Sequence, residues 1–327
     1  MSSKAASVLH EDYRHIREDS AIGAIAPRQQ IAVAGPDRAT YLQGLLTNDI
    51  PALSAGTGCY AAWLTPQGRM LTDMHVLESD GMMLLDLPAF TAEATLARLD
   101  QFHFAEEVTL SALESLTSLW LHGPHAAAAL ETALQAAGLG AWAQYQHQPL
   151  RFQEQPVVVA RIDQLGVPGY CVFVAPAARD ALCTTLAAAG VVAVSQEAID
   201  AARVEAGYPL FGADMKEDTI PLEAGIEGRA ISTSKGCYVG QEVIIRVLHR
   251  GHGRVARHLV GLAIDGPVVP TGAPILAGDR EVGRVTSAAV SPRAGTVALG
   301  YVHRDFVAPG TALAVGETRL VAQVRPL

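Results

Sequence analysis

The sequence has 327 residues, of which 50% are hydrophobic and 17% are charged, and this composition excludes a largely disordered chain. Its 24 Lys and Arg against 33 Asp and Glu give a formal net charge of −9, which disfavours a surface that binds nucleic acid or anionic membranes. No apolar stretch is long enough to span a membrane, and the first residues lack the apolar core of a signal peptide. We therefore expect a cytoplasmic globular protein, and the length predicts about two domains.

The N-terminal part of the sequence predicts helices and an antiparallel meander. Its periodicity indicates a helix over 8–18, a strand over 30–35 that ends in a Gly-Pro-Asp turn, and a helix that starts after Asp37. Short apolar runs separated by two turns then predict three antiparallel strands over 58–86.

The middle of the chain alternates short strands with helices, which we expect near 90–102 and 177–189. This alternation of hairpins and helices predicts an α+β fold rather than a doubly wound parallel sheet. From Leu259 on, Gly and Pro separate short Val-rich runs, which predicts a small β-barrel or sandwich. We expect an α+β body over 8–245 and a β domain over 246–327.

Four cysteines are spread along the chain: Cys59, Cys171, Cys183 and Cys237. None belongs to a Cys-x-x-Cys pair, and their number is far below the density of a disulfide scaffold. We expect reduced cysteines in a reducing compartment and no metal site.

The first candidate site is a cysteine between two glycines, in the segment Ser234-Lys235-Gly236-Cys237-Tyr238-Val239-Gly240-Gln241-Glu242. Glycines permit a tight backbone path, and a nearby cation favours thiolate over thiol, so Lys235 is expected to lower the pKa of Cys237. This pattern predicts a reactive cysteine. The alternative is that the glycines shape a turn around a small, buried Cys237.

A second candidate is Glu205, which shortly precedes Gly207, Tyr208 and Pro209. A carboxylate accepts two parallel hydrogen bonds, so Glu205 suits a ligand with two adjacent N–H donors, such as the edge of a pterin or a guanine. The alternative is a surface ion pair between Glu205 and one of the two nearest arginines, Arg203 or Arg229.

A third candidate is the basic stretch over 246–258, which holds four arginines, three histidines and no acidic residue. In a chain with a net charge of −9, this stretch concentrates positive potential where an acidic ligand tail, a phosphate or RNA can dock. Arg246 and Arg254 are the cations that we expect to contact a ligand. The alternative is a solvated basic linker.

The cysteine segment from Lys235 to Glu242 resembles the signature of the YgfZ-type folate-binding proteins. These proteins are a branch of the aminomethyltransferase (glycine-cleavage T-protein) superfamily that is linked to iron–sulfur cluster maintenance. Segments 35–49, 64–69, 203–221 and 283–292 resemble further blocks of the same family, so the resemblance extends over most of the chain.

The resemblance implies two interleaved α+β parts and a C-terminal β-barrel, arranged as a ring around a central tetrahydrofolate site. It implies that Glu205 meets the pterin, and that Asn48, Tyr60 and the basic stretch lie around the ligand. The aminomethyltransferases of this superfamily use an aspartate near the folate N10 atom. Segment 85–93 of this sequence has no aspartate at the matching spacing, and Glu93 is the carboxylate that we expect to replace it.

The sequence therefore predicts a tetrahydrofolate-binding protein that supports the assembly or repair of iron–sulfur enzymes, with Cys237 as its working thiol and Lys235 beside it. Its expected partners are folate and iron–sulfur enzymes or assembly proteins. The alternative is a folate-dependent one-carbon transferase of the aminomethyl or demethylating type. A third possibility is a non-catalytic scaffold that docks other proteins.

Overall fold

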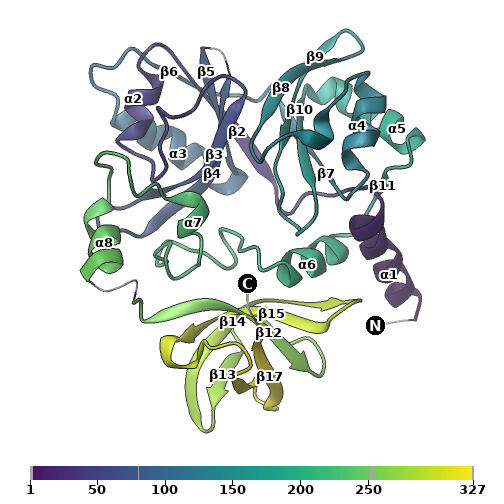
Figure 1. Cartoon of the computed structure of the whole chain (residues 1–327), viewed down its shortest axis with the longest axis vertical. Helices are drawn as coiled ribbons and strands as arrows, with labels where there is room; N and C mark the ends of the chain where they lie inside the picture. Colours follow the sequence, from purple (N-terminus) through teal and green to yellow (C-terminus); the bar gives the residue numbers. More distant parts are fainter. Residues whose placement is uncertain (1–2, 80, 251–253, 326–327) are drawn as a thin grey trace.

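Three β-sheets organise the molecule, and Figure 1 shows two of them side by side above the third. The computed structural model describes residues 3–79, 81–250 and 254–325. Two α+β halves form the body, and a closed β-barrel lies below them. None of the helices within these ranges is long and apolar enough to cross a membrane.

The first half of the body contains a five-stranded sheet in the order β3-β4-β5-β2-β6. Its elements are β2 (Arg28–Ala34), α2 (Arg38–Gln43), β3 (Thr57–Leu64), β4 (Met70–Ser79), β5 (Met82–Pro88), α3 (Ala89–Gln101) and β6 (Thr109–Ala112). The predicted meander is confirmed, because β3, β4 and β5 pair antiparallel in chain order. Asp37 precedes α2 as predicted, but its carboxylate accepts the backbone N–H of Glu107 at 2.8 Å and does not cap the helix.

The second half contains a six-stranded sheet in the order β11-β1-β7-β10-β9-β8. Its elements are β1 (Ala21–Ile22), β7 (Thr117–His122), α4 (Ala126–Leu134), β8 (His147–Phe152), β9 (Gln155–Arg161), β10 (Gly169–Val174), α5 (Pro176–Ala188) and β11 (Val192–Ala193). The chain enters this sheet through β1 before it builds the first half, because β1 pairs with β7 and β11. The two halves are therefore interleaved, as expected.

The C-terminal barrel closes in the order β12-β15-β14-β13-β16-β17. Its strands are β12 (Arg257–Asp265), β13 (Pro274–Ala277), β14 (Arg280–Ser291), β15 (Gly295–His303), β16 (Ala312–Val315) and β17 (Leu320–Arg325). Closure pairs every edge strand, so a small Val-rich sheet exposes no free edge. Before the barrel, α7 (Glu227–Ala230) and α8 (Gln241–Ile245) are followed by a π-helical turn, Arg246–Arg250.

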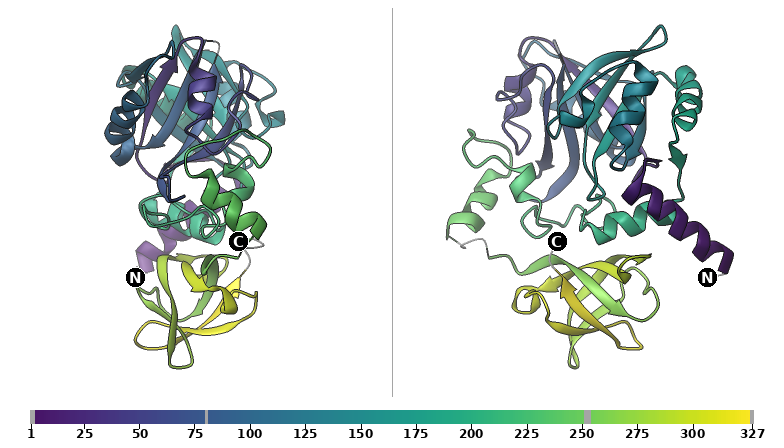
Figure 2. Two further views of the ribbon diagram at one scale, coloured as in Figure 1. Left: turned by 90° about the vertical axis from the view of Figure 1, so that its left-hand side faces the viewer. Right: turned by 45° about the vertical axis from the view of Figure 1, so that its right-hand side comes forward.

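Two helices connect the body to the barrel: α1 (Ser3–Glu18) and α6 (Gln196–Glu205). Figure 2 shows α6 between the two sheets and the barrel. Apolar side chains of α1, α6 and the barrel strands share one buried cluster, which includes Ile16, Ile199 and Leu299. This packing fixes the orientation of the segment that follows α6.

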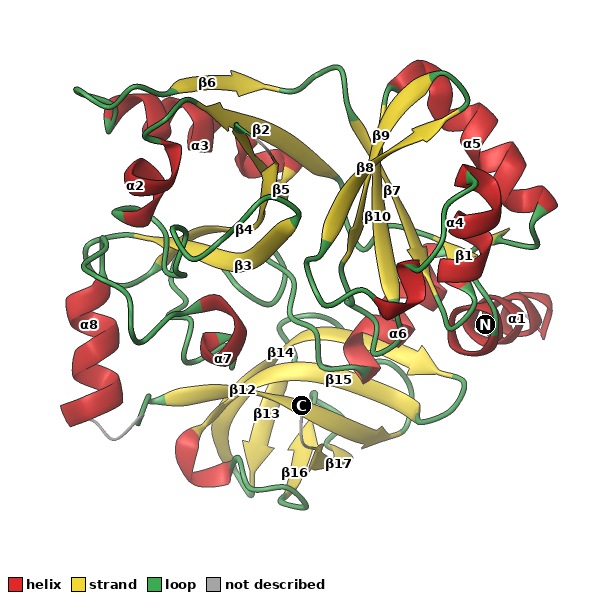
Figure 3. Ribbon diagram, turned by 45° about the horizontal axis from the view of Figure 1, so that its top comes forward, coloured by secondary structure: helices red, strands yellow, loops and turns green. Residues whose placement is uncertain are grey.

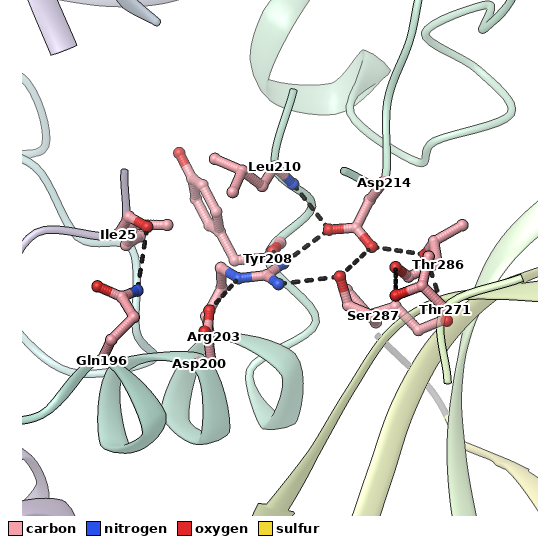
Figure 4. Close-up of polar contacts among 11 residues, drawn as sticks. Ile25, Gln196, Asp200, Arg203, Tyr208, Leu210, Asp214, Thr271, Thr286 and Ser287 are labelled. Atoms are coloured by element: carbon pink, nitrogen blue, oxygen red, sulfur yellow. Dashed lines mark hydrogen bonds and ion pairs between the residues drawn. The ribbon is translucent and has the colours of Figure 1, made fainter. Parts of the chain in front are cut away.

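A buried ion pair holds that segment in place (Figure 4). Arg203 donates to Asp214 at 2.6 Å and to the backbone carbonyl of Tyr208 at 3.0 Å. The two charged side chains are 4% and 0% exposed. Barrel residues Thr286 and Ser287 donate to the second oxygen of Asp214, at 2.5 and 2.7 Å. One network of hydrogen bonds therefore connects α6, the segment after it and β14.

Candidate functional site

A narrow cavity lies where the two halves of the body meet the segment after α6, and Figure 3 shows the two sheets on either side of this region. Its walls include Tyr60 of β3, Asp73 and His75 of β4, Trp120 of β7, and Tyr208. The space free for a water-sized molecule is only about 10 Å³. Polar side chains from four separate segments therefore converge on a site that is closed in this conformation.

Tyr60 and Asp73 form the first buried pair of this cavity. The Tyr60 hydroxyl donates to Oδ2 of Asp73 at 2.6 Å. Burial, and next the negative charge of Asp73, raise the pKa of Tyr60 well above its usual 10, so the tyrosine keeps its proton. Oδ1 of Asp73 is buried and has no hydrogen-bond partner in the part of the chain that the structure describes. A buried carboxylate oxygen without a partner is costly, which indicates a ligand or water there.

His75 and Asp86 form the second pair. Nδ1 of His75 lies 3.0 Å from Oδ2 of Asp86, and Gln30 donates to the other carboxylate oxygen at 2.9 Å. Arg28 donates to the same carboxylate and lies 3.4 Å from Nδ1 of His75. Burial alone raises the pKa of Asp86, but Arg28 and His75 outweigh it, so the pKa is lowered and Asp86 is an anion.

A tyrosine cage holds a permanent cation beside the cavity. The guanidinium of Arg229 lies 4.7 Å from the ring centre of Tyr60 and 4.1 Å from that of Tyr208. Burial lowers the pKa of Arg229, but the surrounding tyrosines and Asp73 raise it further, so the group stays charged. Asn48 donates to the backbone carbonyls of Tyr60 and Arg229, at 2.9 and 3.2 Å. Asn48 thus joins β3 to α7 and positions both side chains.

The structure brings two of the sequence-predicted ligand residues to this cavity: Tyr60 lines it and Asn48 supports it. Sequence reasoning missed Asp73, His75 and Arg229. Glu93, the carboxylate expected from the sequence, is exposed on α3. The carboxylate with one unpartnered oxygen is Asp73 of β4. Asp73 and His75 alternate along β4, but Thr72, Glu78 and Ser79 of the same strand are polar too, so the sequence does not single the pair out.

Glu205 lies away from this cavity, at the junction of α1, α6 and the barrel. Its side chain is 1% exposed and accepts hydrogen bonds from Tyr13 at 2.5 Å, from Ser291 and from Arg293. The ion-pair partners of Glu205 are Arg17 and Arg293, so the prediction of Arg203 or Arg229 as its partner was wrong. Two residues advance a helix by about 200°, so Glu205 faces away from the side on which Arg203 meets Asp214.

The contacts of Glu205 predict a structural role. Replacing Glu205 with Gln should lower the free energy of unfolding by about 1.5–3 kcal/mol, since it weakens charge-assisted hydrogen bonds. Burial raises the pKa of Glu205, but Ser291, Tyr13 and the arginines lower it below its usual 4.5. The ionised Glu205 therefore stabilises the fold above pH 4.5, and this stabilisation is lost as the pH falls through the lowered pKa of the folded protein. In acid, urea unfolding should give the parent and the variant similar free energies of unfolding. The same variant tests the predicted contact with a pterin. Weaker tetrahydrofolate binding by Glu205→Gln would support Glu205 as a ligand-binding residue.

The cysteine segment forms a surface loop. Cys237 is exposed, so the prediction of a small buried side chain was wrong. Gly240 has φ +85°, and a Cβ there would lie 2.5 Å from the carbonyl oxygen of Thr65, so the tight turn requires glycine. Lys235 is 8% exposed and donates to the carbonyls of Gln43, Leu46 and Asn48, at 2.8, 2.5 and 2.8 Å.

The ammonium group of Lys235 is therefore committed to the loop that carries Asn48 rather than to Cys237. Burial lowers the pKa of Lys235 to about 8. The residue holds the chain after α2 against the cysteine loop, which is a structural role that its spacing from Cys237 did not indicate. Its catalytic role stays a prediction.

None of the described residues of the basic stretch lines the narrow cavity. Arg246 pairs with Glu242 on the exposed side of α8, and Arg254 is exposed. Arg257 forms ion pairs with Glu223 and Asp218, at 3.1 and 3.3 Å. Residues 251–253 of this stretch lie outside the described residues. Binding of an acidic ligand tail by Arg246 and Arg254 stays a prediction.

A larger cavity, about 430 Å³, lies between the barrel and the segment after Gly212. Several of its charged side chains already have partners: Arg257 pairs with Glu223, and Arg284 pairs with Glu281. Because the unpartnered buried groups Asp73 and His75 line the narrow cavity instead, we place the chemistry there.

Comparisons with known proteins agree with the fold described above. Residues 2–235 match the GCVT N-terminal domain family, and residues 257–325 match the glycine cleavage T-protein C-terminal barrel domain. The aminomethyltransferase of Thermosynechococcus vestitus is 32% identical over 96% of this chain and 85% of its own length. The aminomethyltransferase of Rubrobacter xylanophilus is 29% identical over 98% of this chain and 85% of its own. The crystal structure of the glycine cleavage system aminomethyltransferase T from Bartonella henselae superposes with a TM-score of 0.87 at 26% identity, covering 98% of this chain and 88% of that one.

Proposed function

The chain belongs to the aminomethyltransferase superfamily, with a GCVT N-terminal domain and a T-protein C-terminal barrel, and we propose that it is a tetrahydrofolate-dependent one-carbon transferase. This was the alternative reading of the sequence. The relatives named above are aminomethyltransferases, which favours it over a dedicated role in iron–sulfur repair.

The observation that carries the proposal is the unpartnered Oδ1 of Asp73 in the shared cavity. Tetrahydrofolate, when bound, supplies nitrogen atoms that accept a one-carbon unit. Such a nitrogen loses a proton, and a buried carboxylate oxygen with no protein partner among the described residues can accept it. Tyr60 holds the other oxygen of Asp73, so the free lone pair has a fixed direction.

The surrounding groups fit a pterin. The rings of Tyr60 and Tyr208 offer flat surfaces for a heterocycle, and Arg229 keeps the site from becoming net negative beside Asp73. A pterin ring is larger than the free space of about 10 Å³, so binding must part the walls of the cavity.

The proposal is tested by incubating the protein with tetrahydrofolate and an aminomethyl donor, and detecting methylenetetrahydrofolate by mass together with the ammonia that is released. Tetrahydrofolate should bind in titration calorimetry and ligand should copurify. A protein that binds no folate would overturn the transferase proposal and favour a protein-docking scaffold.

A second function, support of iron–sulfur enzymes through a thiol, is favoured by the exposure of Cys237. Of the four cysteines, Cys59 and Cys171 are buried and Cys183 is half-buried. Burial raises the pKa of Cys59 to about 12 and that of Cys171 well above its usual 9, so neither reacts readily. Cys237 is the thiol that a partner protein reaches most easily.

Alkylation near neutral pH should therefore modify Cys237 first, as read by peptide mass. The Cys237→Ala protein should melt close to the parent and bind tetrahydrofolate equally, since an exposed side chain contributes little to stability. With Cys183→Ala as the matched control, Cys237→Ala should fail to restore iron–sulfur enzyme activity in cells that lack the protein. If Cys237→Ala restored iron–sulfur enzyme activity fully, the thiol function would be excluded and only the transferase function would remain.

A further inference from the structure

We infer that His75 and Trp120 together recognise a lactam edge of the bound heterocycle, with His75 as the hydrogen-bond acceptor and Trp120 as the donor. This inference rests on the proposed folate function and names the part of the ligand that these two residues read. A lactam presents an N–H and a carbonyl oxygen side by side, and a reduced pterin carries such an edge.

The first support is a pair of unpartnered atoms in one cavity. Nε2 of His75 and Nε1 of Trp120 are both buried without a hydrogen-bond partner among the described residues. Both residues line the cavity, their side chains are 1% and 2% exposed, and their ring centres lie 6.0 Å apart. Buried polar atoms of native proteins are nearly always paired, so two complementary ones at one cavity indicate a ligand with one donor and one acceptor.

The second support is the tautomer of His75. A carboxylate only accepts hydrogen bonds, so the 3.0 Å contact with ionised Asp86 places the proton on Nδ1. Arg28 lies 3.4 Å from the same Nδ1 and would favour an unprotonated nitrogen, but this contact is longer than the one with Asp86 and therefore weaker. Nε2 therefore carries a lone pair and accepts an N–H from the ligand.

The third support is the rigidity of His75. Its ring is enclosed by Tyr60, Trp120 and Tyr145, with ring centres at 5.8, 6.0 and 5.9 Å. Asp86, which orients it, is itself held by Arg28 and Gln30. The groups that stabilise this ring are contributed by both halves of the body, so its direction is fixed before the ligand arrives.

The charge state of His75 agrees with an acceptor. The groups that face it are Asp86 of β5, Arg28 of β2, Asp73 of β4, and the neutral rings of Tyr60, Trp120 and Tyr145. Burial, and then Arg28, lower the pKa of His75 below its usual 6.5, and the carboxylates oppose this shift only in part. Nε2 thus stays unprotonated at neutral pH, and ligand affinity should decline only when pH falls through this lowered pKa.

The test compares tetrahydrofolate binding by calorimetry in the parent, His75→Phe and Trp120→Phe. His75→Phe keeps an aromatic ring but removes both ring nitrogens, and Trp120→Phe keeps an aromatic ring but removes the indole N–H with part of the ring. We expect binding about 10- to 100-fold weaker in each variant. His147→Phe is the matched control, because His147 is also buried and its two ring nitrogens lie 3.2 and 3.1 Å from the carbonyl oxygens of Tyr145 and Glu78, outside the narrow cavity. Its affinity should match that of the parent.

Nitrogen NMR of the parent protein, labelled at histidine, gives a readout that does not depend on how the variants fold. The Nε2 resonance of His75 should report an unprotonated nitrogen and shift when tetrahydrofolate is added. Equal affinities for parent and His75→Phe, or an Nε2 resonance that ligand leaves unchanged, would overturn the inference while the folate function stands. A parent that binds no tetrahydrofolate would overturn both.

Discussion

Replacing Asp73 with Asn should slow one-carbon transfer to tetrahydrofolate by about 100-fold or more, the usual contribution of a positioned proton acceptor. Asn keeps the size of the side chain and can still accept from Tyr60, so the hydroxyl contact of 2.6 Å survives. What the variant loses is the negative charge and basic lone pair at Oδ1. Single-turnover formation of methylenetetrahydrofolate, followed by mass, measures the effect.

Glu93→Gln is the matched control, because Glu93 is the carboxylate that the sequence favoured and it is exposed on α3. Its turnover should equal that of the parent. Tyr60→Phe removes the hydroxyl that orients Asp73 and should cause a smaller loss than Asp73→Asn. If Glu93→Gln were slow and Asp73→Asn were normal, the proton acceptor would lie on α3 and not on β4.

Removing one partner of the Arg203 and Asp214 ion pair should lower the free energy of unfolding by about 3–5 kcal/mol. Both side chains are almost fully buried. Arg203→Met leaves the Asp214 carboxylate without its cation, and Asp214→Ala leaves the guanidinium with only Asp200, which is 41% exposed and 3.6 Å away. Urea unfolding of each variant measures the loss. The double variant should be more stable than the two single losses added together predict, because it leaves no buried charge without a partner.

The matched control for this pair is Arg246→Ala. Arg246 also pairs with a carboxylate, Glu242, but the two side chains are 58% and 83% exposed, so we expect a change within about 0.5 kcal/mol. Arg203 also donates to the carbonyl of Tyr208, so Arg203→Met should weaken tetrahydrofolate binding through the cavity wall. A loss for Arg203→Met no larger than that for Arg246→Ala would contradict the structural role.

The sequence predicts most of the fold because its patterns are local. The meander of β3 to β5 follows from turns at fixed intervals, and the barrel strands follow from Val-rich runs separated by Gly and Pro. The two-residue strand β1 could not be predicted, because it forms only through pairing with β7, about a hundred residues later. The start of the barrel at Arg257 is likewise set by pairing with β15.

The candidate site was harder to predict because its residues meet through long-range contacts. Tyr60 and Asn48 were found through the family resemblance. Asp73 and His75 were missed, because β4 is buried on both faces and shows no apolar alternation that singles out its polar side chains. Glu205 lies away from the narrow cavity, because it is on the side of α6 that meets α1 and Ser291, and the sequence does not show which side that is. Its contact with a pterin stays a prediction.

A crystal structure of the protein with tetrahydrofolate tests the central claim most directly, because it locates the ligand among the candidate sites. We predict that the pterin lies between the two halves of the body, with a nitrogen within hydrogen-bonding distance of Oδ1 of Asp73. A pterin in the larger cavity beside the barrel, or against Glu205, would contradict the proposed site.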